Sequence, residues 1–202
     1  MSRRMKVAVY SGSFNPMHIG HIAVIEYLLS DGGFDMVYLV VSPHNPFKDS
    51  SMRNNARERY LAACEAIKRR GLDKVVKVED LELHRAVPSY TIETLDELKS
   101  REPSKDFSLV IGGDNLANMF NWRNGERILC DYGVVVYPRE GSNADSVGRK
   151  LRLQHQNAEK ISGRPHKPLR IKILKEAPQV DVSSTMIREM MATGKDVSHL
   201  LA

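Results

Sequence analysis

The sequence predicts an α/β protein in which a doubly wound parallel sheet carries helices on both faces, with a small C-terminal helical part. Short apolar runs rich in β-branched residues alternate with stretches of helical periodicity along the chain. The 202 residues, 42% hydrophobic and 27% charged, suit one globular domain over residues 1–202. Strands that alternate with helices pair in parallel, and such sheets bind ligands at the carboxyl ends of their strands.

Each element follows from apolar spacing and from the residues that stop it. Apolar or alternating runs predict strands at 5–10, 34–41, 74–79, 107–111, 133–137 and 169–174. Helical spacing predicts helices at 18–30, 56–70, 90–101 and 183–193, and glycines follow the first two. The last strand alternates apolar and basic residues, so its polar face is expected to be exposed. A polar loop rich in Pro and Asn covers 42–55.

The net charge and the cysteine content indicate which cellular compartment and which kinds of partner to expect. The net charge of +5 and the pI near 9.2 fit phosphate-rich partners, either nucleotides or nucleic acid. The two cysteines, Cys64 and Cys130, lie among apolar neighbours and are expected to be buried thiols without a disulfide. We see no signal peptide, and no apolar stretch approaches the roughly 20 residues of a membrane span. A cytoplasmic protein without a membrane partner is expected.

The segment 149–175 is unusually basic, with nine Lys or Arg residues and one acid, Glu159. A solvated helix and loop is the favoured interpretation, because no aromatic residue interleaves for base stacking. A nucleic-acid patch is the alternative.

The segment 11–21, SGSFNPMHIGH, carries the strongest chemical signal, because it follows a strand and opens a helix. Backbone N–H groups and the helix dipole bind anions in that context. Gly12 permits a tight turn, and Gly20 leaves room for an adenine or a ribose. His18 and His21 lie three residues apart, so both project from one face of the first helical turn. The combination predicts a polyphosphate site.

A second signal lies near the other end of the chain, where 182–188 reads VSSTMIR. Ser183 and Ser184 can cap a helix and turn hydroxyl and N–H groups toward an anion. Arg188 follows one turn later and offers a fixed positive fork for phosphate.

Together these segments resemble the nucleotidylyltransferase superfamily. The HIGH at 18–21 resembles its (T/H)xGH signature, shared with class I aminoacyl-tRNA synthetases, and 182–188 resembles its ISSTxIR motif. The resemblance implies a Rossmann-like fold and ATP as a substrate. The ATP contacts that it implies are Gly12, Ser13, Phe14, His18, Gly20, His21, Gly112, Asp114, Ser183, Ser184 and Arg188.

Further segments resemble the bacterial nicotinate-nucleotide adenylyltransferase family. The SPHNPFK at 42–48 resembles its PxxxPPHK loop and carries over the phosphate-binding Lys48, although Asn45 and Phe47 depart from the pattern. The SYTIETL at 89–95 resembles its SYTxxTL, and 111–122 resembles its GxDxxxxxxxW. The acceptor contacts that the resemblance implies are Ser13, Phe14, Lys48, Ser89, Tyr90, Thr91, Trp122 and Arg139.

This family resemblance implies the reaction of ATP with nicotinate mononucleotide to give deamido-NAD and pyrophosphate, a step of NAD biosynthesis. The attacking group is an ionised phosphate, so the reaction needs positioning and charge stabilisation without a general base. His18, His21, Lys48 and Arg188 are the expected catalytic residues, holding the triphosphate. Mg²⁺ is expected on the ATP phosphates, since no carboxylate cage is evident for a resident ion.

Other functions and simpler roles stay open. Pantetheine-phosphate adenylyltransferase shares both nucleotide motifs but resembles this chain less around 89–95 and Trp122. A class I synthetase fragment would need a KMSKS-like loop and a longer chain. A non-catalytic nucleotide sensor, or a nucleic-acid binder that uses 149–175, is the alternative from a different class.

The chosen residues also have structural interpretations. Trp122 could be core, Asp114 could cap a helix, and Tyr90 and Thr91 could merely begin one. The sequence ends sooner than is usual in the family, and it leaves open whether the chain forms a homo-oligomer and how far nicotinate is preferred over nicotinamide.

Overall fold

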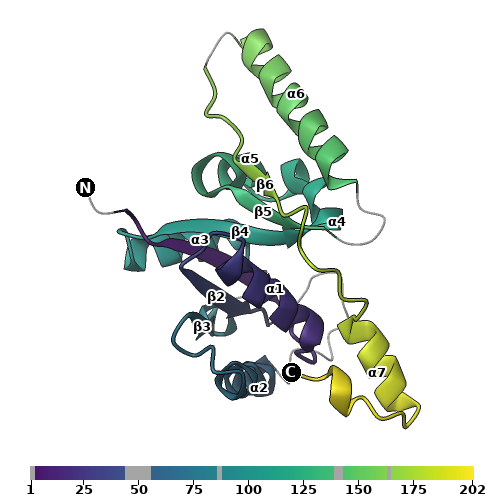
Figure 1. Cartoon of the computed structure of the whole chain (residues 1–202). Coiled ribbons are helices and arrows are strands. Elements are labelled where there is room, and N and C mark those ends of the chain that lie inside the picture. Colours follow the sequence, from purple (N-terminus) through teal and green to yellow (C-terminus); the bar gives the residue numbers. More distant parts are fainter. Residues whose placement is uncertain (1–2, 44–55, 86–87, 139–142, 163–164) are drawn as a thin grey trace. The chain divides into compact units, whose positions relative to one another are not determined.

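Six described strands form one sheet in the order β3-β2-β1-β4-β5-β6 (Figure 1). Their bounds are β1 Lys6–Gly12, β2 Met36–Val41, β3 Val76–Glu79, β4 Asp106–Gly112, β5 Val134–Tyr137 and β6 Ile171–Ile173. The pairs β2 with β3, β4 with β5, and β5 with β6 are parallel. This order is that of a doubly wound, dinucleotide-binding type of sheet, so the predicted fold class is confirmed.

The computed structural model describes residues 3–43, 56–85, 88–138, 143–162 and 165–202. They fall into two compact units. The first unit comprises Met1–Ala8 and Tyr90–Ala177, and the second comprises Val9–Ser89 and Pro178–Ala202. The single domain expected over residues 1–202 stays a prediction.

The second unit packs helices onto β2 and the end of β1. It contains α1 Ile19–Ser30, α2 Ala56–Arg69, the 3-10 helix η2 Leu81–His84, α7 Ser184–Ala192 and the 3-10 helix η5 Ser198–Leu200. β2 is buried from its second residue onward, as expected for a strand covered on both faces. The apolar face of α1 buries Ile22, Val24, Ile25 and Leu28. The helices expected at 18–30, 56–70 and 183–193 are all present, with ends shifted by a residue.

The first unit is built on β4, β5 and β6. It contains α3 Thr91–Arg101, α4 Gly113–Leu116, η3 Met119–Asn121, α5 Gly125–Arg127, the π-helical turn η4 Ile128–Tyr132 and α6 Ala144–Ser162. In β6 the exposed Lys172 lies between two half-buried isoleucines, so the expected exposed polar face is confirmed.

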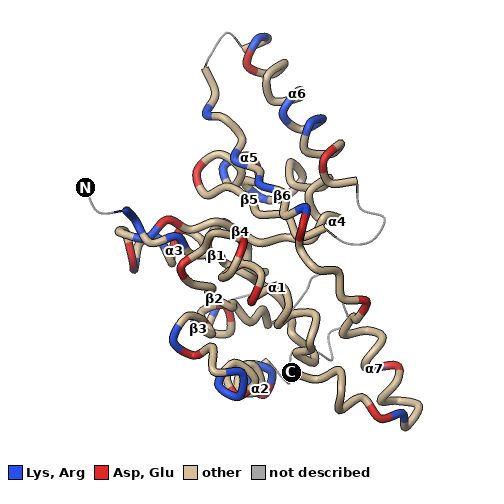
Figure 2. The backbone as a smooth tube through the Cα atoms, viewed as in Figure 1, with Lys and Arg blue, Asp and Glu red and all other residues tan. Residues whose placement is uncertain are grey.

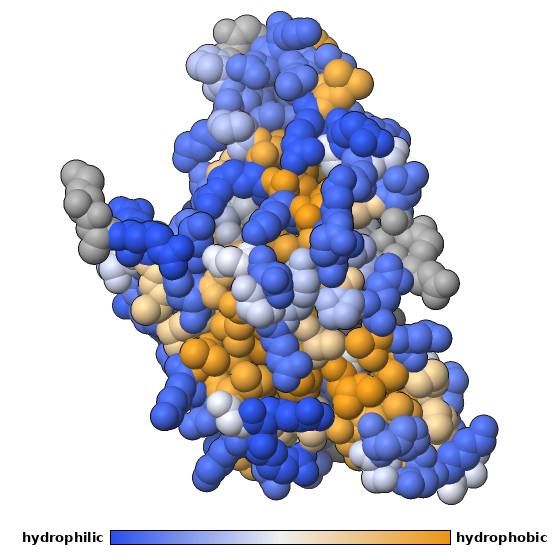
Figure 3. All heavy atoms as spheres, viewed as in Figure 1, coloured by the Kyte–Doolittle hydropathy of each residue, from blue (hydrophilic) through white to orange (hydrophobic). Residues whose placement is uncertain are grey.

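The basic segment proves to contain most of a 19-residue helix, α6. One face buries Ala144, Gly148, Leu151 and His155, spaced four, three and four residues apart. Arg149, Lys150, Arg152 and Lys160 lie off that face, and the outer surface of the helix is mostly hydrophilic (Figures 2 and 3). The described residues thus contain a helix and then a loop, as expected, with the helix beginning five residues before the basic segment, and the choice between a solvated surface and a nucleic-acid patch stays a prediction.

The cysteines differ from expectation in their burial. Both are free, but Cys64 and Cys130 are half-buried and not fully buried. Cys64 lies at the margin of the α2 stripe, next to the fully buried Ala63, and Cys130 turns its Sγ toward the Lys167 carbonyl at 3.3 Å. Burial is also the main reason why the pKa of the Cys130 thiol is raised. Among the described residues, no helix is both long and apolar enough to cross a membrane.

Candidate active site

A sharply bent turn joins β1 to α1 in the second unit. β1 ends at Gly12, and α1 begins after the N-cap residue His18. Phe14 has a left-handed backbone with φ of 45° and a side chain only 3% exposed. A Cβ on Gly12 would lie 3.0 Å from Cζ of this ring, so a larger residue there would require the ring to shift by a few tenths of an ångström. The Phe14 side chain therefore packs inside the protein. The ligand contact that the family resemblance implies for Phe14 would use its backbone.

The two histidines of the turn lie against each other. Their rings stack with centroids 3.7 Å apart and planes inclined by 28°. The His18 backbone N–H donates to Nδ1 of His21 at 3.2 Å, so a neutral His21 carries its proton on Nε2. The ring of Phe14 contacts His21 edge-on with 5.0 Å between centroids. Packing and one hydrogen bond therefore fix both the orientation and the tautomer of His21.

The two imidazoles differ in their exposure to solvent. His18 is only 4% exposed, whereas His21 is half-buried and more open to a ligand. A Cβ on Gly20 would lie 3.0 Å from Nδ1 of His18, so this glycine makes space for the histidine ring itself. The room expected beside Gly20 for an adenine or a ribose stays a prediction.

The segment 182–188 contacts the segment 11–21, as the family resemblance implies. Ser183 is the N-cap of α7, and its Oγ accepts from the Met186 N–H at 3.2 Å, which confirms the expected cap. The Ser184 hydroxyl donates to the Pro16 carbonyl at 3.1 Å. Arg188 donates from Nη1 to the Asn15 carbonyl at 2.7 Å.

These contacts give the three residues protein partners, and the anion contacts expected of them stay predictions. Ser183 Oγ accepts a backbone N–H, while Ser184 and one arm of Arg188 donate to carbonyls that the bent turn directs at α7. Arg188 also donates from Nη2 to Thr185 Oγ1 at 3.1 Å. A guanidinium has five N–H donors, so it retains capacity for a phosphate.

Arg59 of α2 is a site residue that sequence reasoning missed. It is only 5% exposed, and Nη1 donates to the Ser13 carbonyl and, at 3.0 Å, to the Ser42 carbonyl. Nη2 donates to the Pro43 carbonyl at 3.1 Å. Arg59 therefore ties the turn after β1 to the start of the loop after β2, and desolvation lowers its pKa. The signal was present: a lone arginine within the apolar stripe of the helix at 56–70.

One predicted acceptor residue of the first unit, Tyr90, lies against Arg123. Its guanidinium carbon lies 4.3 Å from the centroid of the Tyr90 ring, and Nη1 lies 3.4 Å from Oε1 of Glu93. Trp122, the next residue, is half-buried, unlike the fully buried Met119 three residues earlier. Thr91 is the first residue of α3, so the helix-start interpretation holds for it.

The remaining predicted site residues lie near the end of β4, in the loop before α3, or outside the residues that the structure describes. Gly112 is the N-cap of α4 and Asp114 is exposed in its first turn, so the N-cap interpretation of Asp114 is wrong. Ser89 is half-buried in the second unit. Lys48 and Arg139 lie outside the described residues.

Replacing Arg59 by Met should cost about 2–4 kcal/mol of unfolding free energy, because three part-buried carbonyls lose a charged donor. Turnover should fall as well, since the two loops lose their common partner. The matched control is Arg57→Met in the same helix, whose exposed pair with Asp80 at 3.5 Å is worth less than about 1 kcal/mol. Urea denaturation and turnover, measured on both variants, check this. Equal stability of the two variants would contradict the role of Arg59.

Comparison with known proteins agrees with this geometry. The cytidylyltransferase-like family model matches residues 9–190. A protein of Bacteroides fragilis named probable nicotinate-nucleotide adenylyltransferase is 37% identical over 98% of this chain and 88% of its own length. One of the same name from Flavobacterium johnsoniae is 34% identical over 98% and 92%.

A solved structure supports the fold alone. The Plasmodium falciparum nicotinic acid mononucleotide adenylyltransferase complexed with NaAD superposes with a TM-score of 0.71 at 17% identity, covering 96% of this chain and 87% of that one. With the family model, the two full-length relatives and both nucleotide motifs in agreement, the chain belongs to the cytidylyltransferase-like family and, within it, to the nicotinate-nucleotide adenylyltransferases.

Proposed function

We propose that this chain transfers the adenylyl group of ATP to nicotinate mononucleotide, giving deamido-NAD and pyrophosphate in NAD biosynthesis. The observation that carries the proposal is the turn after β1, which presents a fixed Nε2–H donor on His21 at the first turn of a helix. Such a donor, beside a helix N-terminus, suits the phosphates of a nucleotide. The relatives that match the chain over nearly its full length bear the name of this activity.

The chemistry requires little from the protein beyond charge and position. A phosphate oxygen of the acceptor attacks the α-phosphorus of ATP, the bond from that phosphorus to the bridging oxygen breaks, and pyrophosphate leaves. Because the attacking oxygen is already ionised, no proton has to be removed. Negative charge grows on the departing phosphates, and donors that are already oriented stabilise it without reorganising.

We assign the ATP phosphates to the second unit. His21 donates from Nε2 and Arg188 from the part of its fork that does not bind Asn15. His18 acts mainly through its backbone N–H, which sets the tautomer of His21. Lys48 retains the phosphate role that the family resemblance implies. Gly112 and Asp114 of the first unit retain the nucleotide contact implied for the end of β4.

Mg²⁺ fits as an ion carried by ATP and not held by a protein cage. The segment 11–21 contains no Asp or Glu, so this turn offers an ion no carboxylate. Magnesium keeps several waters and is commonly bound through substrate phosphates. The ion would neutralise charge on the phosphates, while His21 and Arg188 fix their position. Small molecules are the proposed partners, without nucleic acid, and the oligomeric state is left open.

Acceptor identity is the direct test of this function. We expect pyrophosphate release with ATP and nicotinate mononucleotide, and much less with pantetheine phosphate. Nicotinamide mononucleotide in the same assay measures the preference for the acid. Equal or greater turnover of pantetheine phosphate would refute the assigned acceptor, and no release with any acceptor would favour a non-catalytic nucleotide sensor.

Trp122 reports acceptor binding, since it is the only tryptophan and is half-exposed. The proposed stacking on the electron-poor pyridine ring predicts a saturable change of its emission when nicotinate mononucleotide is added, with or without ATP. Trp122→Ala should weaken acceptor binding by about 1–3 kcal/mol, on the scale of bases stacked on aromatic side chains. ATP affinity should stay nearly constant.

The competing structural role of Trp122 predicts a different pair of results. Emission would ignore the acceptor, and the Ala variant would lose about 3–5 kcal/mol of folding stability, as a buried aromatic does. Fluorescence titration and thermal unfolding of the same two proteins distinguish these outcomes. Emission of the unchanged protein that ignores the acceptor, together with a badly destabilised Ala variant, rules out the stacking role.

A further inference from the structure

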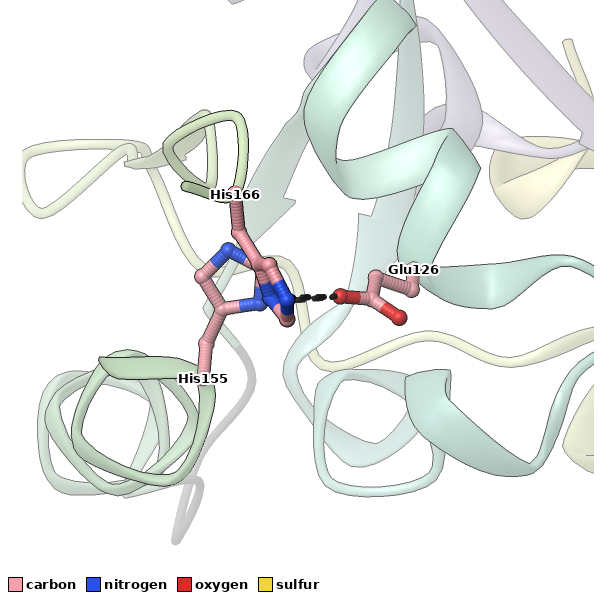
Figure 4. Close-up of side chains that lie close together, drawn as sticks. All are labelled: Glu126, His155 and His166. Carbon is pink, nitrogen blue, oxygen red and sulfur yellow. Dashed lines mark ion pairs between the residues drawn. The ribbon is translucent and has the colours of Figure 1, made fainter. Parts of the chain in front are cut away.

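Three side chains that the proposed reaction does not use converge within the first unit (Figure 4). Glu126 comes from α5, His155 from α6, and His166 from the segment between α6 and β6. One ligand atom from each lies within 4.8 Å of the others, and among the residues that the structure describes this is the one such group of three. Elements that are distant in sequence thus bring two nitrogens and one oxygen together.

Both imidazoles turn the same kind of atom toward Glu126. Nδ1 of His155 lies 3.0 Å from Oε1 of Glu126, and Nδ1 of His166 lies 3.8 Å from the same oxygen. On the far side, Nε2 of His155 lies 2.8 Å from the Lys167 carbonyl, which can only accept, so this nitrogen carries the proton. The Nδ1 lone pair of a neutral His155 therefore points at the cluster. Metal-binding histidines show this pattern, in which a carbonyl or carboxylate holds the other ring nitrogen.

His166 adds an independent observation. Its Nε2 lies 3.3 Å from Oγ of Ser162, whereas its Nδ1 is buried without a hydrogen-bond partner among the described residues. Glu126 is too far from that nitrogen for a hydrogen bond, at 3.8 Å. A buried polar atom without a partner is costly. An ion placed between the three side chains would supply the missing partner.

The donor set selects the class of ion. Two imidazole nitrogens with one carboxylate oxygen suit Zn²⁺ and related transition metals, whereas Mg²⁺ prefers oxygen ligands alone. Tetrahedral zinc with bonds of about 2.0–2.1 Å needs ligand atoms roughly 3.3 Å apart. The observed spacings of 3.0 and 3.8 Å bracket that value, so modest side-chain movement is enough. His155 is only 6% exposed, while the Glu126 side chain is 55% exposed and leaves a route for entry.

We propose that Glu126, His155 and His166 form a binding site for a divalent transition-metal ion of the Zn²⁺ class. Oε1 of Glu126 and the two Nδ1 atoms are the ligands, and water completes the coordination. The ion links α5, α6 and the segment leading into β6, so its role is to fix the C-terminal half of α6 within the first unit. The site is independent of the adenylyl transfer and of the Mg²⁺ that ATP carries.

The test uses the full chain, stripped of metal with a chelator and transferred to chelator-free buffer without ATP. Zn²⁺ is titrated in competition with a chromophoric chelator, and Co²⁺ binding is followed by its visible absorption. We expect one Zn²⁺ per chain, a tetrahedral Co²⁺ spectrum and a higher unfolding temperature with Zn²⁺, because a ligand that binds only the folded state stabilises it. Mg²⁺ should not reproduce these effects.

Glu126→Gln and His166→Ala change the two more exposed ligands and spare the buried His155. Each should weaken Zn²⁺ binding by at least the roughly 10–100-fold seen for lost supporting contacts at metal sites, and should abolish the Co²⁺ spectrum. His199→Ala, an exposed histidine of the second unit, is the matched control and should bind like the unchanged protein. Circular dichroism without metal checks that each variant is folded.

Two outcomes would overturn the proposal. One is the absence of one-to-one binding at micromolar Zn²⁺ in the unchanged protein. The other is binding that persists equally in folded Glu126→Gln and His166→Ala, which would assign the ion to other side chains. Loss of Zn²⁺ binding in these variants with normal pyrophosphate release would separate the site from the catalytic function.

Discussion

The second unit depends on satisfying the backbone carbonyls of one bent turn. The residues between β1 and α1 belong to no strand or helix, so their carbonyls need partners from elsewhere. Arg59 of α2 donates to the Ser13 carbonyl, while Ser184 and Arg188 of α7 donate to the carbonyls of Pro16 and Asn15. Charged and hydroxyl donors from two distant helices thus hold a segment that has no regular hydrogen bonds of its own.

This arrangement explains how a short turn orients the donors of the proposed phosphate site. The His18 N–H donates to His21, and the Phe14 ring packs against the same imidazole, so its Nε2–H is aimed before a substrate arrives. Adenylyl transfer to a phosphate needs such positioning more than it needs proton transfer. The guanidinium of Arg188 both supports the turn and remains a potential donor to the substrate, so structure and binding share one side chain.

Much of the fold was predictable because the spacing of apolar residues and the residues that end helices and strands indicated the same elements along the chain. The strands at 107–111 and 133–137 and the helix at 90–101 appear with small shifts at their ends. The meeting of 11–21 with 182–188 followed from family resemblance, since no local pattern joins segments so far apart. Arg59 was missed because its place in the apolar stripe indicates burial at most, and the carbonyls that it serves lie far away in the sequence.

Other features depend on tertiary packing that the sequence does not display. The burial of His18 arises from stacking on His21 and from the close approach of Gly20. The half-exposure of both cysteines reflects where their helical turns meet the core. The cluster of Glu126, His155 and His166 joins residues 40 positions apart, and only the two histidines lie within the basic segment 149–175.

The central claim is that His21 stabilises charge in the transition state, and His21→Ala tests it most directly. Turnover with ATP and nicotinate mononucleotide should fall by about 10²–10³, the scale for losing one preorganised donor, while the KM for ATP changes far less. Circular dichroism should be unchanged, and the exposed His84→Ala should retain full turnover as the matched control. Near-normal turnover of a folded His21→Ala protein would contradict the account.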